Sequence, residues 1–138
     1  MPAVLRLIVL VPLGYLAAVL VAATVVVVGV LGPFEPGFVP YFAFPFAAAI
    51  TMTGAAALVP AAVAIAAAEV FRLRSVLFYL AVGGALGLAF AGLSDFHGSA
   101  ELIARRPVLY PAAGLAGAFV YWLIAGRLAG RVRPPPRP

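Results

Sequence analysis

The sequence predicts an all-α integral membrane protein in which four transmembrane helices form an antiparallel up-down bundle of two helical hairpins. The first observation is four apolar runs, each close to or above the roughly 20 residues that a helix needs to cross a hydrocarbon core of ~30 Å. The second is that no Asp, Glu, Arg or His falls inside any run. The third is that the connections are short. The runs cover residues 7–31, 42–68, 76–93 and 108–125.

The first run, residues 7–31, continues for 25 residues without a charged side chain. A cleaved signal peptide is the alternative interpretation, with Arg6 as its basic segment. The apolar part of a signal peptide covers only about 7–15 residues, however, so we expect a retained first span. Thr24 is the one small polar side chain of this run, and its hydroxyl is expected to bond a carbonyl of the preceding turn.

The connection over residues 32–41 contains three Pro, two Gly and three aromatic side chains. Gly and Pro at this density disfavour a regular helix, and aromatic rings are typical of the headgroup level of a membrane. We therefore expect an interfacial turn. A re-entrant pore loop is the alternative, although Glu35 is the only charged residue of the segment.

The second run, residues 42–68, contains two prolines with different expected effects. Pro45 lies in the first turn, where a missing amide hydrogen costs little. Pro60 lies in mid-helix and cannot donate to the carbonyl of Ala56, so we predict a kink there. The connection that follows is so short that the second and third runs must be antiparallel neighbours, and Ser75 is well placed to cap the third helix.

Small residues repeat every four positions in the third and fourth runs. This spacing lets two helix backbones approach closely, which favours association between helices in lipid. The predicted helix-packing residues are Gly83, Gly87, Ala91, Gly114 and Gly117. The pattern does not say whether the partner helix belongs to the same molecule or to another.

The only cluster of ionisable side chains lies between the third and fourth runs. Asp95, His97 and Glu101 are weak candidates for a metal site or a proton path, since imidazole and carboxylate groups are common ligands. Their spacing matches no defined metal motif. We therefore expect a hydrated connector that holds no metal, in which Glu101 pairs with Arg105 at helical i, i+4 spacing.

After the fourth run, the expected features are those of a membrane interface. Tyr121 and Trp122 are predicted to form an aromatic anchor, and the Pro/Arg-rich residues 131–138 are predicted to form an extended tail. We treat residues 1–138 as a single four-helix membrane domain.

All nine Lys or Arg residues of the chain are Arg. Their distribution along the sequence predicts how the protein is oriented in the membrane. With four spans, both termini and the middle connection share one side of the membrane, and that side carries seven Arg against two on the other. The positive-inside rule then places both termini in the cytoplasm. The use of Arg without Lys, with abundant Ala, Gly, Pro and Val, indicates a GC-rich bacterial genome and hence a bacterial inner membrane. Because the Arg residues lie at span ends, where they meet lipid headgroups, we exclude nucleic acid as a partner.

The composition excludes most enzymatic chemistry. The chain has no Cys and a single His, and its only small hydroxyl side chains are three Ser and three Thr. Nucleophilic catalysis needs a nucleophile, a His base and a carboxylate close together, and the chain has few residues of these types. We therefore expect no catalytic residues and no cofactor. The preferred function is an accessory or structural subunit that packs against itself or a larger membrane complex. The alternative is an oligomeric channel or transporter for a neutral or lipid-like substrate, because an ion path normally shows a buried ionisable group.

Overall fold

The computed structural model describes residues 6–32, 39–96 and 108–128, and within these ranges every regular element is a helix. A short π-helix (Arg6–Leu10) leads into the first α-helix, and a 3-10 turn (Gly126–Leu128) follows the last. The four α-helices are α2 (Val11–Leu31), α3 (Val39–Val70), α4 (Val76–Phe96) and α6 (Leu109–Ile124). The all-α prediction is confirmed, and the ends of the helical segments lie within three residues of the predicted runs when the π-helix is counted with α2.

Two of the helical segments are long and apolar enough to cross a membrane, namely Ile8–Leu31 and Tyr41–Val70. The apolar parts of the other two helices are shorter, at Val76–Gly92 and Leu109–Ile124. At 1.5 Å per residue, the 16 residues of α6 rise about 24 Å, less than a typical hydrocarbon core. The fourth run is shorter as a helix than as a sequence because Val108 and Ala125 are its caps.

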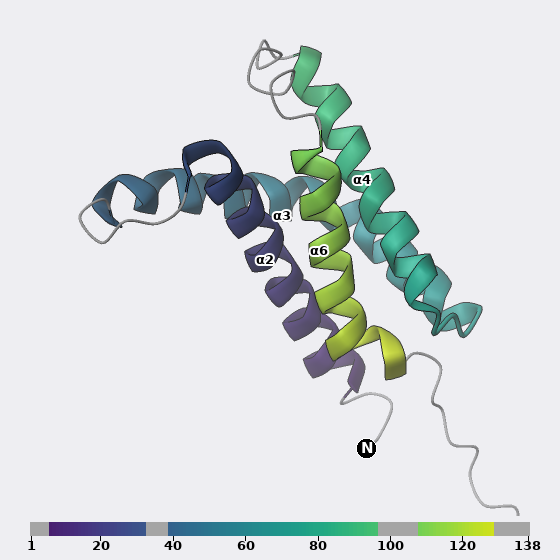
Figure 1. Ribbon diagram of the computed structural model, residues 1–138. Helices are drawn as coiled ribbons and strands as arrows, with labels where there is room; N and C mark the ends of the chain where they lie inside the picture. The colour runs from purple at the N-terminus through teal and green to yellow at the C-terminus, as the bar shows by residue number, and fades with distance from the viewer. Residues whose placement is uncertain (1–5, 33–38, 97–107, 129–138) are drawn as a thin grey trace, which may run out of the picture.

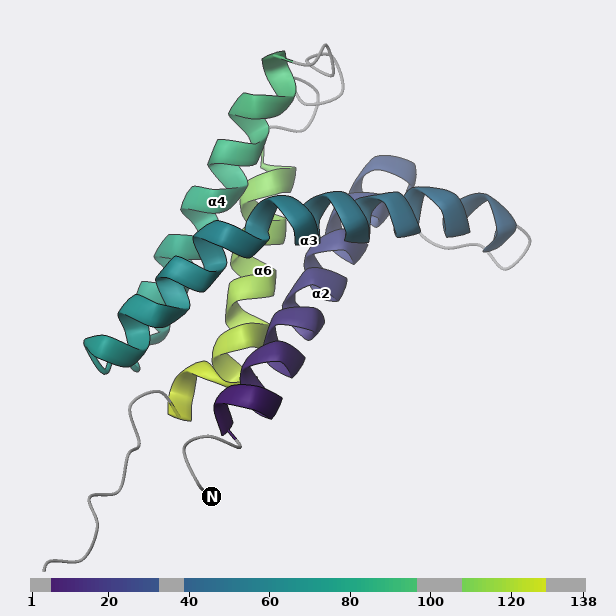
Figure 2. The same cartoon turned by 180° about the vertical axis from the view of Figure 1, so that it is seen from behind.

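Three of the helices lie side by side in one layer, with α6 between α2 and α4 (Figure 1). Helices α2 and α4 run in the same direction, and α6 runs in the opposite one. Helix α3 crosses one face of this layer, and its first part extends beyond α2 (Figure 2). The oblique course of α3 distinguishes the arrangement from a regular up-down bundle.

Helix α3 also changes direction between its two ends, as Figure 2 shows. The prediction that Pro45 lies in the first turn is wrong, because α3 begins at Val39, and both Pro45 and Pro60 lie inside the helix. The predicted kink at Pro60 stays a prediction. The connection that was expected to lie at the membrane interface or to re-enter it falls mostly on residues 33–38, outside the described part of the chain.

The turn from α3 to α4 is held by a C-capping motif. The Leu73 amide donates to the carbonyl of Ala68 at 2.9 Å, and the Arg72 amide donates to the carbonyl of Glu69 at 3.4 Å. These are the two bonds of a Schellman motif, in which one residue takes a left-handed conformation that Gly usually fills. Arg72 fills it here with a φ of 54°. Ser75 then caps α4 as predicted, since its Oγ accepts from the Leu77 amide at 3.3 Å.

The most tightly buried cluster lies where the ends of three elements meet. It comprises Ala68, Tyr79, Tyr121 and Ala125, and the rings of Tyr79 and Tyr121 lie 5.7 Å apart. The predicted interfacial anchor is therefore wrong for Tyr121, which is only 8% exposed. Its position on α6 turns it toward α4 instead of outward. Trp122 donates from Nε1 to the carbonyl of Arg74 at 2.8 Å and so joins α6 to the α3–α4 turn.

Candidate functional site

Helices α4 and α6 contact each other at glycine residues. A Cβ added at Gly83 would collide with the carbonyl oxygen of Gly114, and one added at Gly114 would collide with the carbonyl oxygen of Gly83. One turn further along, a Cβ at Gly87 would collide with the Tyr110 carbonyl and would lie 2.7 Å from Pro111 Cα. Backbone therefore rests directly on backbone over this crossing, a contact that only glycine allows.

Helix α6 also meets α2 at a glycine. A Cβ at Gly117 would lie 2.9 Å from the carbonyl oxygen of Ala18. Of the predicted packing residues, the structure thus brings Gly83, Gly87 and Gly114 together at one crossing and uses Gly117 at another. Ala91 is half-buried, further along α4.

Among the described residues, a half-open cleft of about 150 Å³ lies between α3 and the three-helix layer. All four helices contribute to its wall. The surface of the lining is almost entirely apolar, its α3 side is formed mainly by small side chains, and several of the packing glycines also line it. The lining residues that carry the argument are Ala57, Ala61 and Ala64 of α3, Gly83 and Leu86 of α4, and Tyr110 of α6.

The cleft exists because α3 is held to the other helices at two separated points. At the first, Tyr15 of α2 donates its hydroxyl to the carbonyl of Gly54 at 2.5 Å. At the second, Ala68 is buried in the aromatic cluster with 1% exposure. The fourteen residue steps between Gly54 and Ala68 rise roughly 21 Å. Over this length the cleft side of α3 presents little more than methyl groups, which do not fill the space beneath it.

Several hydroxyl groups in and near the cleft donate hydrogen bonds to backbone carbonyls of the protein itself. The Tyr15 hydroxyl bonds to Gly54, and the Tyr79 hydroxyl donates to the carbonyl of Leu73 at 3.4 Å. Thr51 on α3 and Thr24 on α2 each donate to a carbonyl of the preceding turn, the latter as predicted. A ligand in the cleft would therefore form few hydrogen bonds with its wall. The shape of the cleft and its apolar surface determine which ligands can bind.

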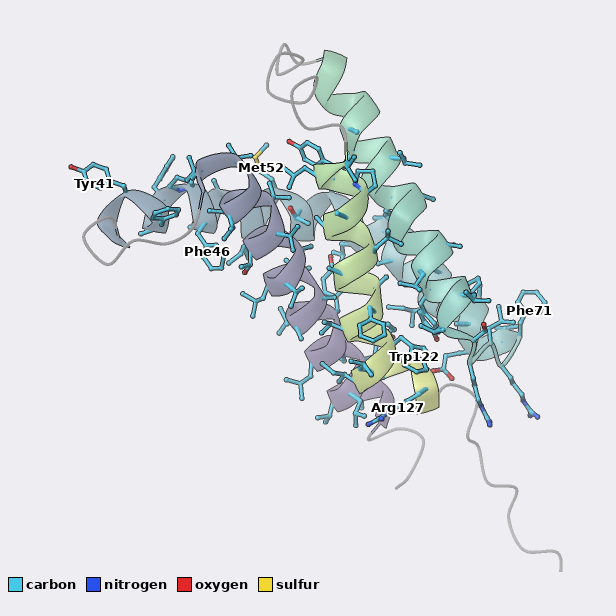
Figure 3. The ribbon with its side chains drawn as sticks, viewed as in Figure 1. Tyr41, Phe46, Met52, Phe71, Trp122 and Arg127 are labelled. Atoms are coloured by element: carbon cyan, nitrogen blue, oxygen red, sulfur yellow. The ribbon has the colours of Figure 1, made fainter. Side chains whose placement is uncertain are left out.

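The other side of α3 is an apolar surface that the described residues do not cover. Its large side chains are among the most exposed in the structure, and Figure 3 shows Tyr41 and Met52 directed away from the other helices. We call this surface the outer face of α3. It comprises Tyr41, Phe44, Met52, Leu58, Val59, Val63 and Val70, which are 53–82% exposed.

The described Arg residues gather at one end of the molecule. Arg6 begins the π-helix, Arg72 and Arg74 lie in the α3–α4 turn, and Arg127 lies in the 3-10 turn; these segments occupy the same end in Figure 1. Figure 3 labels Arg127 close to Trp122 at this end. The opposite end carries the end of α4 and the start of α6.

The weak metal candidates cannot be placed as a group. His97 and Glu101 lie outside the described residues, and Asp95 is at the end of α4 with its side chain likewise outside them. Within the described ranges, no three His, Cys, Asp or Glu side chains come together.

Sequence reasoning missed the cleft. Its only signal was that Thr53, Ala57, Ala61 and Ala64 share one face of α3, and such spacing is common in a chain rich in Ala. Comparison with protein-family models, with curated proteins and with solved structures gives no match for this chain. Any assignment of function therefore depends on the geometry above.

Proposed function

We propose that the chain is a small multi-pass protein of a bacterial inner membrane that acts as an accessory or structural subunit through helix packing. The observation that carries the proposal is the outer face of α3. Seven large apolar side chains of this one helix are at least half exposed, an arrangement that water disfavours and that lipid or a partner helix accepts.

The distribution of Arg supports a membrane orientation for all four helices. Arg side chains at one end suit the cytoplasmic headgroups, which puts both termini in the cytoplasm. Helix α6 is short for a span, but it lies between α2 and α4 in the layer. Local thinning of the bilayer or snorkelling of flanking residues accommodates a helix of this length at modest cost.

Packing against another chain is the use we propose for the outer face of α3. Helix α6 is occupied on both sides by α2 and α4, whereas no described residue covers the outer face. A second copy or a helix of a larger complex would bury it. The proposed partners are thus membrane lipids and either a second copy or a larger membrane complex.

Absence of Cys makes this proposal testable by disulfide crosslinking in native membranes. A single Cys at Val63, on the outer face, is expected to give a crosslinked dimer if a second copy binds there, and a bifunctional reagent at the same Cys is expected to trap a larger complex. The matched control is Ala64→Cys, the adjacent residue, which lines the cleft. Crosslinking at neither Val63 nor Val59, or equal crosslinking at Ala64, would contradict the proposal.

Membrane insertion and topology need their own test. Carbonate extraction should leave the chain in the membrane, and reporter fusions after Arg133 and within residues 34–39 should report cytoplasmic and periplasmic positions, respectively. A periplasmic reporter after Arg133 would refute the four-span topology.

The second candidate function is a channel or transporter for a neutral or lipid-like substrate. The cleft favours it, because its wall is apolar and includes α3 residues on both sides of Pro60. Transport of a lipid-like dye across reconstituted vesicles would distinguish this function from a purely structural one.

A further inference from the structure

We propose that the cleft between α3 and the α2–α6–α4 layer binds one linear hydrocarbon chain of a lipid. The proposal rests on the membrane location proposed above. It assigns a ligand class to the cleft and is independent of whether the outer face of α3 binds a partner.

The shape of the cleft selects a linear ligand. Its lining runs from Tyr79 to Phe90 on α4 and from Tyr110 to Tyr121 on α6. Each stretch covers eleven residue steps, or roughly 16 Å at 1.5 Å per residue. A volume of about 150 Å³ drawn out over this length is narrow. It suits a single extended chain better than a fused ring system or two chains side by side.

The chemistry of the wall selects hydrocarbon. Apolar cavities stay dry and accept apolar molecules, because water placed there would lack the two to four polar partners that it needs. The hydroxyls of Tyr15 and Tyr79 already donate to backbone carbonyls. Thr53, Tyr110 and Tyr121 also line the cleft, but its surface is almost entirely apolar. The wall therefore offers mainly dispersion contacts along its length, and the headgroup would stay outside the cleft.

We infer that a lipid chain enters the cleft between α3 and α4. These helices share the turn at one end but make few contacts beyond it. The gap faces sideways, into the hydrocarbon region of the proposed membrane, and the cleft spans about half of a ~30 Å core. A lipid chain can thus enter laterally without taking its headgroup across the core. Burial of its methylene groups against Ala57, Ala61 and Leu86 would replace the missing contacts beneath α3.

Photolabelling of the full chain in vesicles of phosphatidylethanolamine and phosphatidylglycerol tests the proposal. One arm uses phosphatidylethanolamine with a diazirine on one acyl chain, and the other uses diazirine palmitic acid. Mass spectrometry is expected to place label on residues of the cleft, and unlabelled lipid should saturate that labelling. Comparison of the two arms shows whether the chain belongs to a phospholipid or to a free fatty acid.

Two neighbouring substitutions provide the matched comparison. Ala61→Phe fills the cleft, whereas Ala62→Phe adds the same side chain at an exposed position of α3. Saturable labelling should fall on the order of tenfold in the first variant and stay unchanged in the second. Circular dichroism checks folding, and Ala57→Leu serves as the filling variant if Ala61→Phe does not fold.

Label found only on the outer face of α3, or saturable labelling that survives both filling variants, would overturn the inference. A membrane-inserted chain without cleft labelling would refute this inference and leave the proposed function standing. Release of the chain by carbonate would instead refute the proposed function.

Discussion

The crossing of α4 and α6 should not accommodate the single carbon atom that the substitution Gly87→Ala adds. Its Cβ would lie 2.7 Å from Pro111 Cα and 2.8 Å from the Tyr110 carbonyl carbon, whereas ordinary contacts lie at 3.4–4 Å. These are backbone atoms, so no side-chain rotation relieves the overlap. The two helices must separate by roughly 1 Å, and a gap of that size forfeits a quarter to a half of each dispersion contact along the crossing.

We therefore expect Gly87→Ala to lower the free energy of unfolding by about 1–3 kcal/mol. Gly87→Leu should lower it further. Gly92→Ala is the matched control, because nothing lies within 4 Å of a Cβ at that position of the same helix, and helix propensity there favours Ala by up to about 1 kcal/mol. Thermal unfolding followed by circular dichroism in detergent measures both changes. A Gly87→Ala variant as stable as Gly92→Ala would refute the backbone-on-backbone crossing.

The other predictions concern the turn, the α2–α3 contact and the outer loop. Arg72→Gly should raise the free energy of unfolding by about 1 kcal/mol, because Gly takes the left-handed conformation without strain; an unchanged melting temperature would argue against that conformation. Tyr15→Phe removes the donor to Gly54 and should cost about 0.5–1.5 kcal/mol in the same assay, and no loss would mean that the bond does not hold α3. Elemental analysis of chain purified without a chelator or a histidine tag should find no stoichiometric metal. About one metal per chain that is lost in His97→Ala, and that weakens below a pH near 6.5, would contradict this expectation.

The sequence by itself determined where the helices lie and which residues could form close contacts. Apolar runs without Asp, Glu, Arg or His predicted the ends of every helical segment within three residues, when the π-helix is counted with α2. Ser75 was recognisable as a cap because its hydroxyl directly precedes the third run. Small residues at intervals of one turn suit a close helix crossing, so the sequence indicated the packing residues Gly83, Gly87 and Gly114. In the structure, the backbones at these glycines lie against each other.

Only the tertiary structure decided which faces meet and where space remains. The helices are apolar all round, so no contrast between a polar and an apolar face indicates which side is buried. For this reason, the sequence did not place α6 in the middle of the layer, turn Tyr121 inward or separate the cleft side of α3 from its outer face. Those features arise because glycine brings α4 and α6 together, while α3 contacts the other helices near Gly54 and near Ala68, on either side of the cleft. The cleft is the space left where small side chains of α3 cross a layer that is already closely packed.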